Sequence, residues 1–146
     1  MSVLTASATP SNGALRHRVD VNRRHTITTD EPEYLGGSDA GPAPHELLPA
    51  MVAACVSTMI VLYAERRGWE LGDVRVDVSY ESETEPRELE VTIHLPEGLT
   101  PDQVTRLERV ADTCPVKRAF EAGFSFERRL VLDLPGRANQ RAKFAA

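Results

Sequence analysis

The sequence predicts an α+β fold in which antiparallel sheets accompany a long central helix. Two pairs of short segments alternate apolar with polar residues, as the strands of half-buried hairpins do. One longer segment repeats its apolar residues every three or four positions, which is the period of a helix face. The chain has 146 residues, 41% of them hydrophobic, which suits one domain with its own core. We expect that domain over 14–135, between a disordered N-terminal tail (1–13) and a polar C-terminal tail (136–146).

The first half of the chain predicts a hairpin, a loop and the long helix. Alternation over 15–21 and 25–30 around a polar turn indicates the hairpin, and Gly and Pro forbid regular structure over most of 31–44. The helix should run from His45 to Arg67, with Gly68 as its stop. Its apolar stripe comprises Leu48, Met51, Val52, Cys55, Met59, Leu62 and Tyr63. Interruptions by proline and hydroxyl residues and a charged end favour a buried helix over a membrane span.

The second half predicts another hairpin followed by two shorter helices. Strands are expected over 74–80 and 89–95. Thr100 and Gln103 form a capping-box pattern around Pro101, which opens a helix whose stripe ends at Cys114. Pro115 breaks that helix, so a third helix should follow and end at Gly123. Residues 124–126 and 130–134 are predicted as a final strand.

Composition excludes several classes of function. The net charge is −5 and basic residues are interleaved with acidic ones, which argues against nucleic-acid binding. The N-terminal residues lack a secretory pattern, so we expect a cytoplasmic protein with reduced thiols and no membrane association. Aromatic residues make up only 5% of the chain, which favours an oligomer because the core has little bulky apolar mass.

Cys55 and Cys114 are the residues best suited to chemistry. Each lies on the apolar stripe of a predicted helix, where a lone cysteine is ordinarily a small packed hydrophobe. Two such stripes that pack together could bring the Cα atoms to the separation of about 5.5 Å that a disulfide needs. Thiols cycle reversibly through sulfenic acid and disulfide, so the pair suggests a redox enzyme.

A buried reactive thiol needs a cation or a hydrogen-bond donor beside it, because burial alone disfavours the thiolate. The candidates are Arg16, Arg18, Arg23, Arg24, His25 and His45, and an arginine is preferred because its charge is permanent. On a continuous helix His45 lies about 80° from Cys55 and Glu46 about 180° away, so Glu46 suits the helix dipole or a partner subunit better. The scattered histidines and the lack of CxxC or HxxxH make a metal site improbable.

Several motifs taken together resemble the OsmC/Ohr family of osmotically inducible and organic hydroperoxide resistance proteins. They are the loop Gly36-Gly37-Ser38-Asp39-Ala40-Gly41-Pro42-Ala43-Pro44-His45-Glu46-Leu47-Leu48, then Ala53-Ala54-Cys55, Ala64-Glu65-Arg66-Arg67-Gly68-Trp69 and Cys114-Pro115-Val116. The resemblance implies a two-layer fold, an intertwined homodimer and an active site at the subunit interface. It also implies that Cys55 is peroxidatic, that Cys114 resolves the sulfenic acid as a disulfide, and that a dithiol reduces the enzyme without a bound cofactor.

Two departures from the hydroperoxidase branch bear on activity. That branch has a Glu ten residues before the peroxidatic cysteine to orient a catalytic Arg, whereas this chain has His45 there and Glu46 beside it. Arg16 is the closest positional candidate for that Arg, in a stretch that matches poorly. The sequence therefore indicates a stress-response thiol peroxidase for small organic hydroperoxides. The rivals are a dimer that binds a small hydrophobic ligand without turnover and a stress-related dimer whose cysteines only pack.

Overall fold

The computed structural model describes residues 3–13 and 15–132, and its helices and strands confirm the α+β class. In chain order the elements are β1 (Ala6–Pro10), β2 (His17–Val21), β3 (His25–Thr29), the 3-10 turns η1 (Glu33–Leu35) and η2 (Pro44–Glu46), α1 (Leu47–Arg66), β4 (Arg75–Glu81), β5 (Glu88–His94), α2 (Pro101–Ala111) and α3 (Pro115–Ala122). The strands form two antiparallel sheets, ordered β1-β2-β3 and β4-β5.

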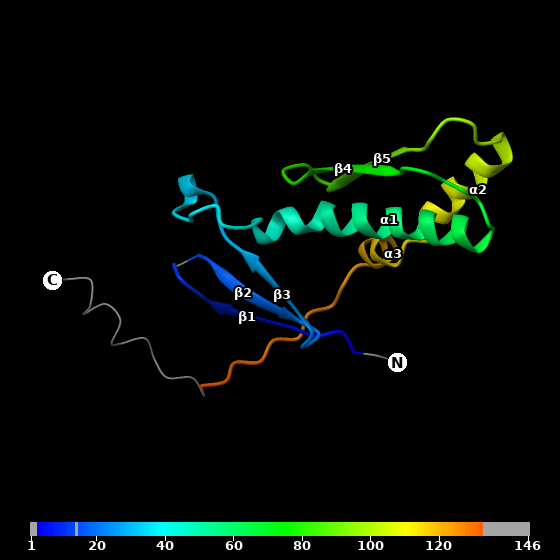
Figure 1. Cartoon of the computed structure of the whole chain (residues 1–146). Coiled ribbons are helices and arrows are strands. Elements are labelled where there is room, and N and C mark those ends of the chain that lie inside the picture. The colour runs from blue at the N-terminus through cyan, green and yellow to red at the C-terminus, as the bar shows by residue number, and fades with distance from the viewer. Residues whose placement is uncertain (1–2, 14, 133–146) are drawn as a thin grey trace.

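Helix α1 is the centre of the main body, with the β4–β5 hairpin along one side and α2 and α3 packed against it as well (Figure 1). The hairpin register places Val76 opposite Ile93 and Val78 opposite Val91, so its apolar side chains share the face toward α1. Its other face is polar and exposed. The buried core consists of Val52, Val56, Ile60, Ala64, Leu71, Leu107, Ala111 and Cys114.

The three-stranded sheet stands apart from this body (Figure 1). Among the described residues it makes no extensive contact with α1, α2, α3 or the β4–β5 hairpin. The structure also differs from the expected disordered tail at 1–13, because Ala6–Pro10 forms β1 and pairs with β2. All five side chains of β1 are exposed, so the strand depends on backbone pairing and leaves no apolar pattern in the sequence.

The final strand expected at 124–126 and 130–134 is not formed within the described residues, and 133–134 lie outside them. Residues 123–132 are instead an extended segment that pairs with no strand of the described residues. Phe126 and Leu130 on this segment are 91% and 87% exposed. The apolar alternation is therefore present, but among the described residues this segment pairs with no sheet edge.

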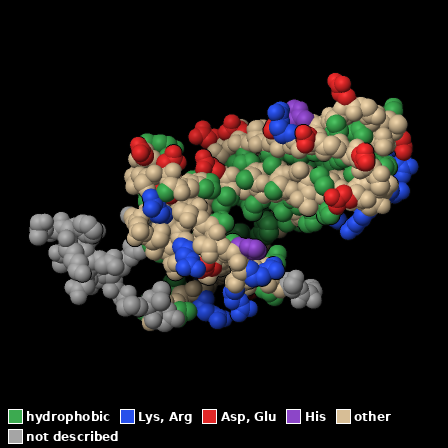
Figure 2. Space-filling model, in the orientation of Figure 1, with side chains coloured by type: hydrophobic (Ala, Val, Ile, Leu, Met, Phe, Trp, Pro, Cys, Tyr) green, Lys and Arg blue, Asp and Glu red, His purple; other side chains and the backbone are tan. Residues whose placement is uncertain are grey.

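The buried stripe of helix α1 overlaps the predicted one only in part: Val52 is buried, and Cys55, Met59 and Tyr63 pack against the core. The fully buried positions recur every four residues from Val52 to Ala64, whereas Met51 and Leu62 of the predicted stripe are 44% and 41% exposed. The helix is apolar on nearly every side, so periodicity alone does not identify the face that packs. Its length and composition would also suit a membrane span, a test that core helices of soluble proteins pass too. Figure 2 shows apolar side chains exposed along α1 above a recess next to the three-stranded sheet.

Candidate active site

The two cysteines, 59 positions apart in the sequence, meet between α1 and α3. Cys55 lies in the third turn of α1 and is half-buried, and Cys114 is completely buried at the start of α3. Both are free thiols, and Cys55 packs against the core cluster that includes Cys114, close enough for Cys114 to affect the pKa of Cys55. The expected convergence of two helix-borne sulfurs is thus present within one subunit.

Cys114 is positioned by the break between α2 and α3. Pro115 occupies the first position of α3, so Cys114 becomes the N-cap residue, and the backbone N–H of Lys117 donates to its Sγ at 3.4 Å. The Lys117 ammonium is engaged elsewhere, by Asp112 and Glu121. The Cys114 sulfur therefore lies at the N-terminal end of α3 and accepts a backbone hydrogen bond there.

Cys55 has a less favourable environment for ionisation. Burial raises the pKa of the Cys55 thiol, the hydrogen bond with Cys114 raises it further, and the backbone N–H of Val116 opposes both effects. Among the described residues, no lysine, arginine or histidine side chain hydrogen-bonds to either sulfur. Within the described residues, the pKa of Cys55 is therefore raised and no hydrogen-bonded side-chain cation offsets the shift.

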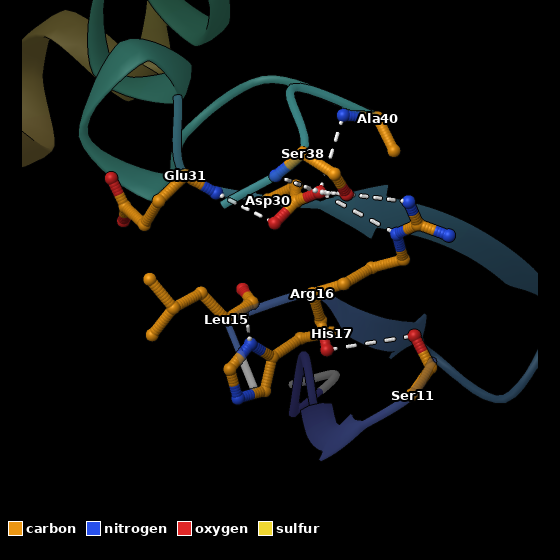
Figure 3. A network of polar contacts seen from close by, with 8 residues as sticks. All are labelled: Ser11, Leu15, Arg16, His17, Asp30, Glu31, Ser38 and Ala40. Carbon is orange, nitrogen blue, oxygen red and sulfur yellow. Dashed lines mark hydrogen bonds and ion pairs between the residues drawn. The ribbon is translucent and has the colours of Figure 1, made fainter. Parts of the chain in front are cut away.

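Arg16 lies at the start of β2 in a separate polar network, drawn in Figure 3. Its Nε is 3.5 Å from Oδ2 of Asp30, and its Nη2 donates to the Ser38 hydroxyl at 2.7 Å. By contrast, Arg18 pairs with Asp20 on an exposed part of the sheet. The structure thus distinguishes two of the candidates for the cation beside Cys55. A buried carboxylate holds the Arg16 guanidinium, whereas the partner of Arg18 is exposed.

Asp30 is the centre of that network, and sequence reasoning missed it. It is 1% exposed and accepts hydrogen bonds from the Glu31 and Ala40 N–H groups and from both the N–H and the hydroxyl of Ser38. These bonds, that from the Ser38 hydroxyl above all, lower the pKa of Asp30 to about 2 although burial opposes them. No spacing rule joins residues 16, 30 and 38, so the sequence held no signal for this cluster.

The glycines of the loop explain how it encloses Asp30. A Cβ on Gly37 would lie 1.7 Å from the Glu31 carbonyl oxygen, and one on Gly41 would lie 2.5 Å from that of Thr28. Only glycine permits such close approach of two backbones. The loop therefore folds directly onto the end of β3 and aims its N–H groups at the carboxylate.

His45 and Glu46, the other predicted site residues, form contacts of their own. The His45 ring stands edge-on to Tyr80 of β4, with Nε2 3.3 Å from the phenol oxygen. Glu46 Oε2 accepts the Ala43 N–H at 2.9 Å and so caps the turn η2. Neither hydrogen-bonds to a sulfur or to Arg16 within the described chain. One subunit thus brings the two cysteines together. Arg16, His45 and Glu46 make their contacts elsewhere, with Asp30 and Ser38, with Tyr80 and with the Ala43 backbone respectively.

A groove of about 270 Å³ opens beside the helices that carry the sulfurs. Its apolar lining comes from α1, β5 and α3, namely Val52, Leu89, Val91 and Phe120. Arg87, Lys117 and Glu121 also line it. Such a groove suits the apolar part of a small organic molecule.

Comparison with known proteins places these features in a family. A family model described as OsmC-like protein matches residues 36–128, more than half of the chain, and this span includes the glycine loop and both cysteines. No curated protein matches the chain closely enough to count as a relative.

Solved structures share the fold over most of its length. A candidate osmotic stress induced and detoxification response protein of Psychrobacter arcticus 273-4 superposes with a TM-score of 0.66 at 22% identity, over 81% of this chain and 88% of the other. An organic hydroperoxide resistance protein, OsmC, of Legionella pneumophila gives 0.56 at 25% identity, over 81% and 88%. An organic hydroperoxide resistance protein of Elizabethkingia anophelis gives 0.58 at 24% identity, over 81% and 87%.

Proposed function

Because the chain belongs to the OsmC-like family, we propose that it is a thiol-dependent peroxidase that reduces small organic hydroperoxides. The observation that carries this proposal is the pair of free thiols at Cys55 and Cys114, which the fold brings together between α1 and the start of α3. A second support is that structural neighbours include proteins described as organic hydroperoxide resistance proteins. In this proposal the groove between α1, β5 and α3 would receive the apolar part of the substrate.

The reaction proceeds in two steps at sulfur. The Cys55 thiolate attacks the distal peroxide oxygen, the O–O bond breaks, and the alkoxide takes a proton to leave as an alcohol, so Cys55 becomes a sulfenic acid. The Cys114 sulfur then attacks Cys55, an S–S bond forms, and the hydroxyl leaves as water with the Cys114 proton. A dithiol reductant restores both thiols and is itself oxidised to a disulfide. A cytoplasmic location would supply such reductants.

The cation that activates Cys55 comes from a second subunit in this proposal. Burial and Cys114 raise the Cys55 pKa, and no cation of the same described subunit hydrogen-bonds to the sulfur. Cys55 also lies about 20° around α1 from the exposed Leu62 and about 40° from the exposed Met51, so a subunit packed on that face would reach it. Arg16 of the partner subunit is the assigned cation, since its fork can hold a thiolate and a peroxide oxygen together.

A single-turnover thiol count tests the function. Reduced protein mixed with one equivalent of cumene hydroperoxide should lose two free thiols per subunit within seconds to minutes, and dithiothreitol should restore both. The double variant C55S/C114S should leave the peroxide unconsumed. A protein that retains both thiols after prolonged exposure would be a binding or structural dimer instead, and the peroxidase assignment would be rejected.

A further inference from the structure

Asp30 is a buried charge that its own loop already satisfies. An ionised carboxylate offers about four lone-pair sites, and four donors from Glu31, Ser38 and Ala40 lie 2.7–3.2 Å from its oxygens. A fifth donor, the Arg16 guanidinium, is therefore not needed to compensate the burial of Asp30. The main effect of this contact is on Arg16, because a buried anion holds its guanidinium in place.

Ser38 fixes the orientation of the arginine as well as its position. Its hydroxyl has one proton, which it donates to Asp30 Oδ2 at 2.7 Å, so its oxygen is left to accept from Arg16 Nη2, also at 2.7 Å. The guanidinium is then held at Nε and at Nη2 together. Because the fork is planar, two anchored nitrogens set the direction of the remaining N–H groups. Figure 3 shows the guanidinium beside Asp30 and Ser38.

Neither Glu46 nor His45 performs this task in the same subunit. Glu46 caps the turn before α1, and His45 contacts Tyr80. Asp30 and Ser38 are the described residues that hydrogen-bond to the Arg16 side chain.

We propose that Asp30, acting with Ser38, is the positioning residue that holds the Arg16 guanidinium in the orientation required at Cys55 of the partner subunit. This inference rests on the proposed function, since it assumes that Arg16 serves Cys55. Asp30 touches neither substrate nor sulfur. It acts through the arginine, so its effect requires Arg16 to be present.

A double-mutant cycle tests that requirement. The variants are D30N, R16A and R16A/D30N, with D20N as matched control because Asp20 holds Arg18 on the exposed sheet. One readout is the rate of sulfenic acid formation at Cys55 with cumene hydroperoxide. The other is the pH midpoint of Cys55 alkylation by iodoacetamide, measured on C114S versions, which reports the thiolate without any peroxide chemistry.

D30N should slow peroxide reaction by about 10- to 100-fold, as misplacement of a catalytic group does. A tenfold loss of thiolate at fixed pH corresponds to an alkylation midpoint about one pH unit higher. In the R16A background D30N should change either readout less than twofold, and D20N should match the wild type. S38A, which keeps the carboxylate, should shift both readouts in the same direction as D30N and covers the case in which D30N fails to fold.

Other results reject the inference. If D30N slows the peroxide reaction by the same factor in the wild type and in the R16A background, Asp30 only stabilises the loop. If D30N and S38A leave the alkylation midpoint unchanged, Asp30 does not position the cation. A wild type that does not react with peroxide, yet shows the predicted alkylation cycle, would reject the peroxidase function while supporting the positioning role.

Discussion

Cys55 and Cys114 differ most in their access to solvent. Cys114 is completely buried, whereas Cys55 is partly exposed at the border between the packed and the uncovered faces of α1. In the proposed mechanism a hydroperoxide therefore reaches Cys55 first, and Cys114 reacts with a neighbouring sulfur. Cys55 packs against the core cluster that includes Cys114 and is that neighbour.

Serine substitutions should separate these roles. C55S should abolish peroxide reduction, because the accessible sulfur is gone. C114S should form a sulfenic acid at Cys55 that dimedone traps in stoichiometric amount, since no second thiol is left to condense with it. Mass spectrometry of the labelled protein checks both. Similar residual activity in the two variants would contradict the assignment.

The cysteine pair was predictable from the sequence and the network around Arg16 was not. Both cysteines lie on apolar stripes of the predicted helices, and Pro115 marks the helix junction at which Cys114 lies. Helix periodicity and the helix-breaking effect of proline were therefore enough to identify the pair. Asp30 and Ser38 meet Arg16 only because a glycine loop folds back onto β3. That contact depends on backbone approach, which side-chain periodicity does not record.

The low pKa of Asp30 predicts how its contribution to stability varies with pH. The folded-state pKa is about 2, below the ordinary 3.8, so the ionised carboxylate favours the folded state. The stabilisation should be complete above about pH 4 and should be lost as the pH falls toward 2. Urea unfolding of wild type and D30N at several pH values measures it. A stability difference between the two that stays constant from pH 6 to pH 2 would contradict the expectation.

Among the elements, the loop between β3 and α1 has the most structural roles: it contacts the β3 backbone, encloses Asp30 and leads into α1. Its glycines allow backbone contact with β3, and its N–H groups enclose Asp30. It also leads into α1 through η2, which places Pro49 in the first turn of α1, where a proline ring costs no helical hydrogen bond. The loop therefore links the position of Arg16 to the start of the helix that carries Cys55.

Gly37→Ala tests the backbone contact. The added Cβ would overlap the Glu31 carbonyl oxygen, and we expect a loss of about 3 kcal/mol or more in the free energy of unfolding, at the upper end for overpacking. Gly68→Ala is the control, because its Cβ meets no atom within 4 Å and only its φ of 68° is unfavourable, which costs about 1 kcal/mol. Urea denaturation at one protein concentration measures both. Equal losses would show that steric overlap at Gly37 is not the cause.

The sequence predicted the hairpins and helices well because each has a local signal. The capping box at Thr100 and Gln103 is formed as expected, and so is the β4–β5 hairpin. β1 was missed because its side chains are all exposed, and the packed face of α1 was predicted only in part because apolar residues surround that helix. The final strand was predicted from a pattern that a single subunit does not satisfy.

At the scale of the whole molecule, the described part of one subunit shows three apolar or unpaired surfaces that no other described element covers. They are the outer face of α1, the three-stranded sheet that stands away from the helices, and the extended segment 123–132. Exposed apolar surfaces of this extent are typical of association sites. A second copy that covers α1 and receives the extended segment would account for all three, and this is the homodimer we propose.

Leu62→Glu tests the dimer. Leu62 lies on the exposed face of α1 at 41% exposure, and a charge there should oppose burial against a second copy. Light scattering after size exclusion should give a mass near the 16.1 kDa of one chain and not twice that value, with peroxide turnover lost as well. Thr92→Glu on the outer face of β5 should leave both unchanged. A wild type that is itself monomeric, or a Leu62→Glu variant that stays dimeric, would exclude this interface.

The most direct measurement is to map the disulfide formed when reduced protein meets one equivalent of hydroperoxide. After acid quenching and alkylation of the remaining thiols, mass spectrometry of the tryptic digest should find the Cys55 peptide joined to the Cys114 peptide. A non-reducing denaturing gel should show the mass of a single chain, because the two sulfurs meet within one subunit. Peptides that remain separately alkylated, or a crosslink between chains, would contradict the account.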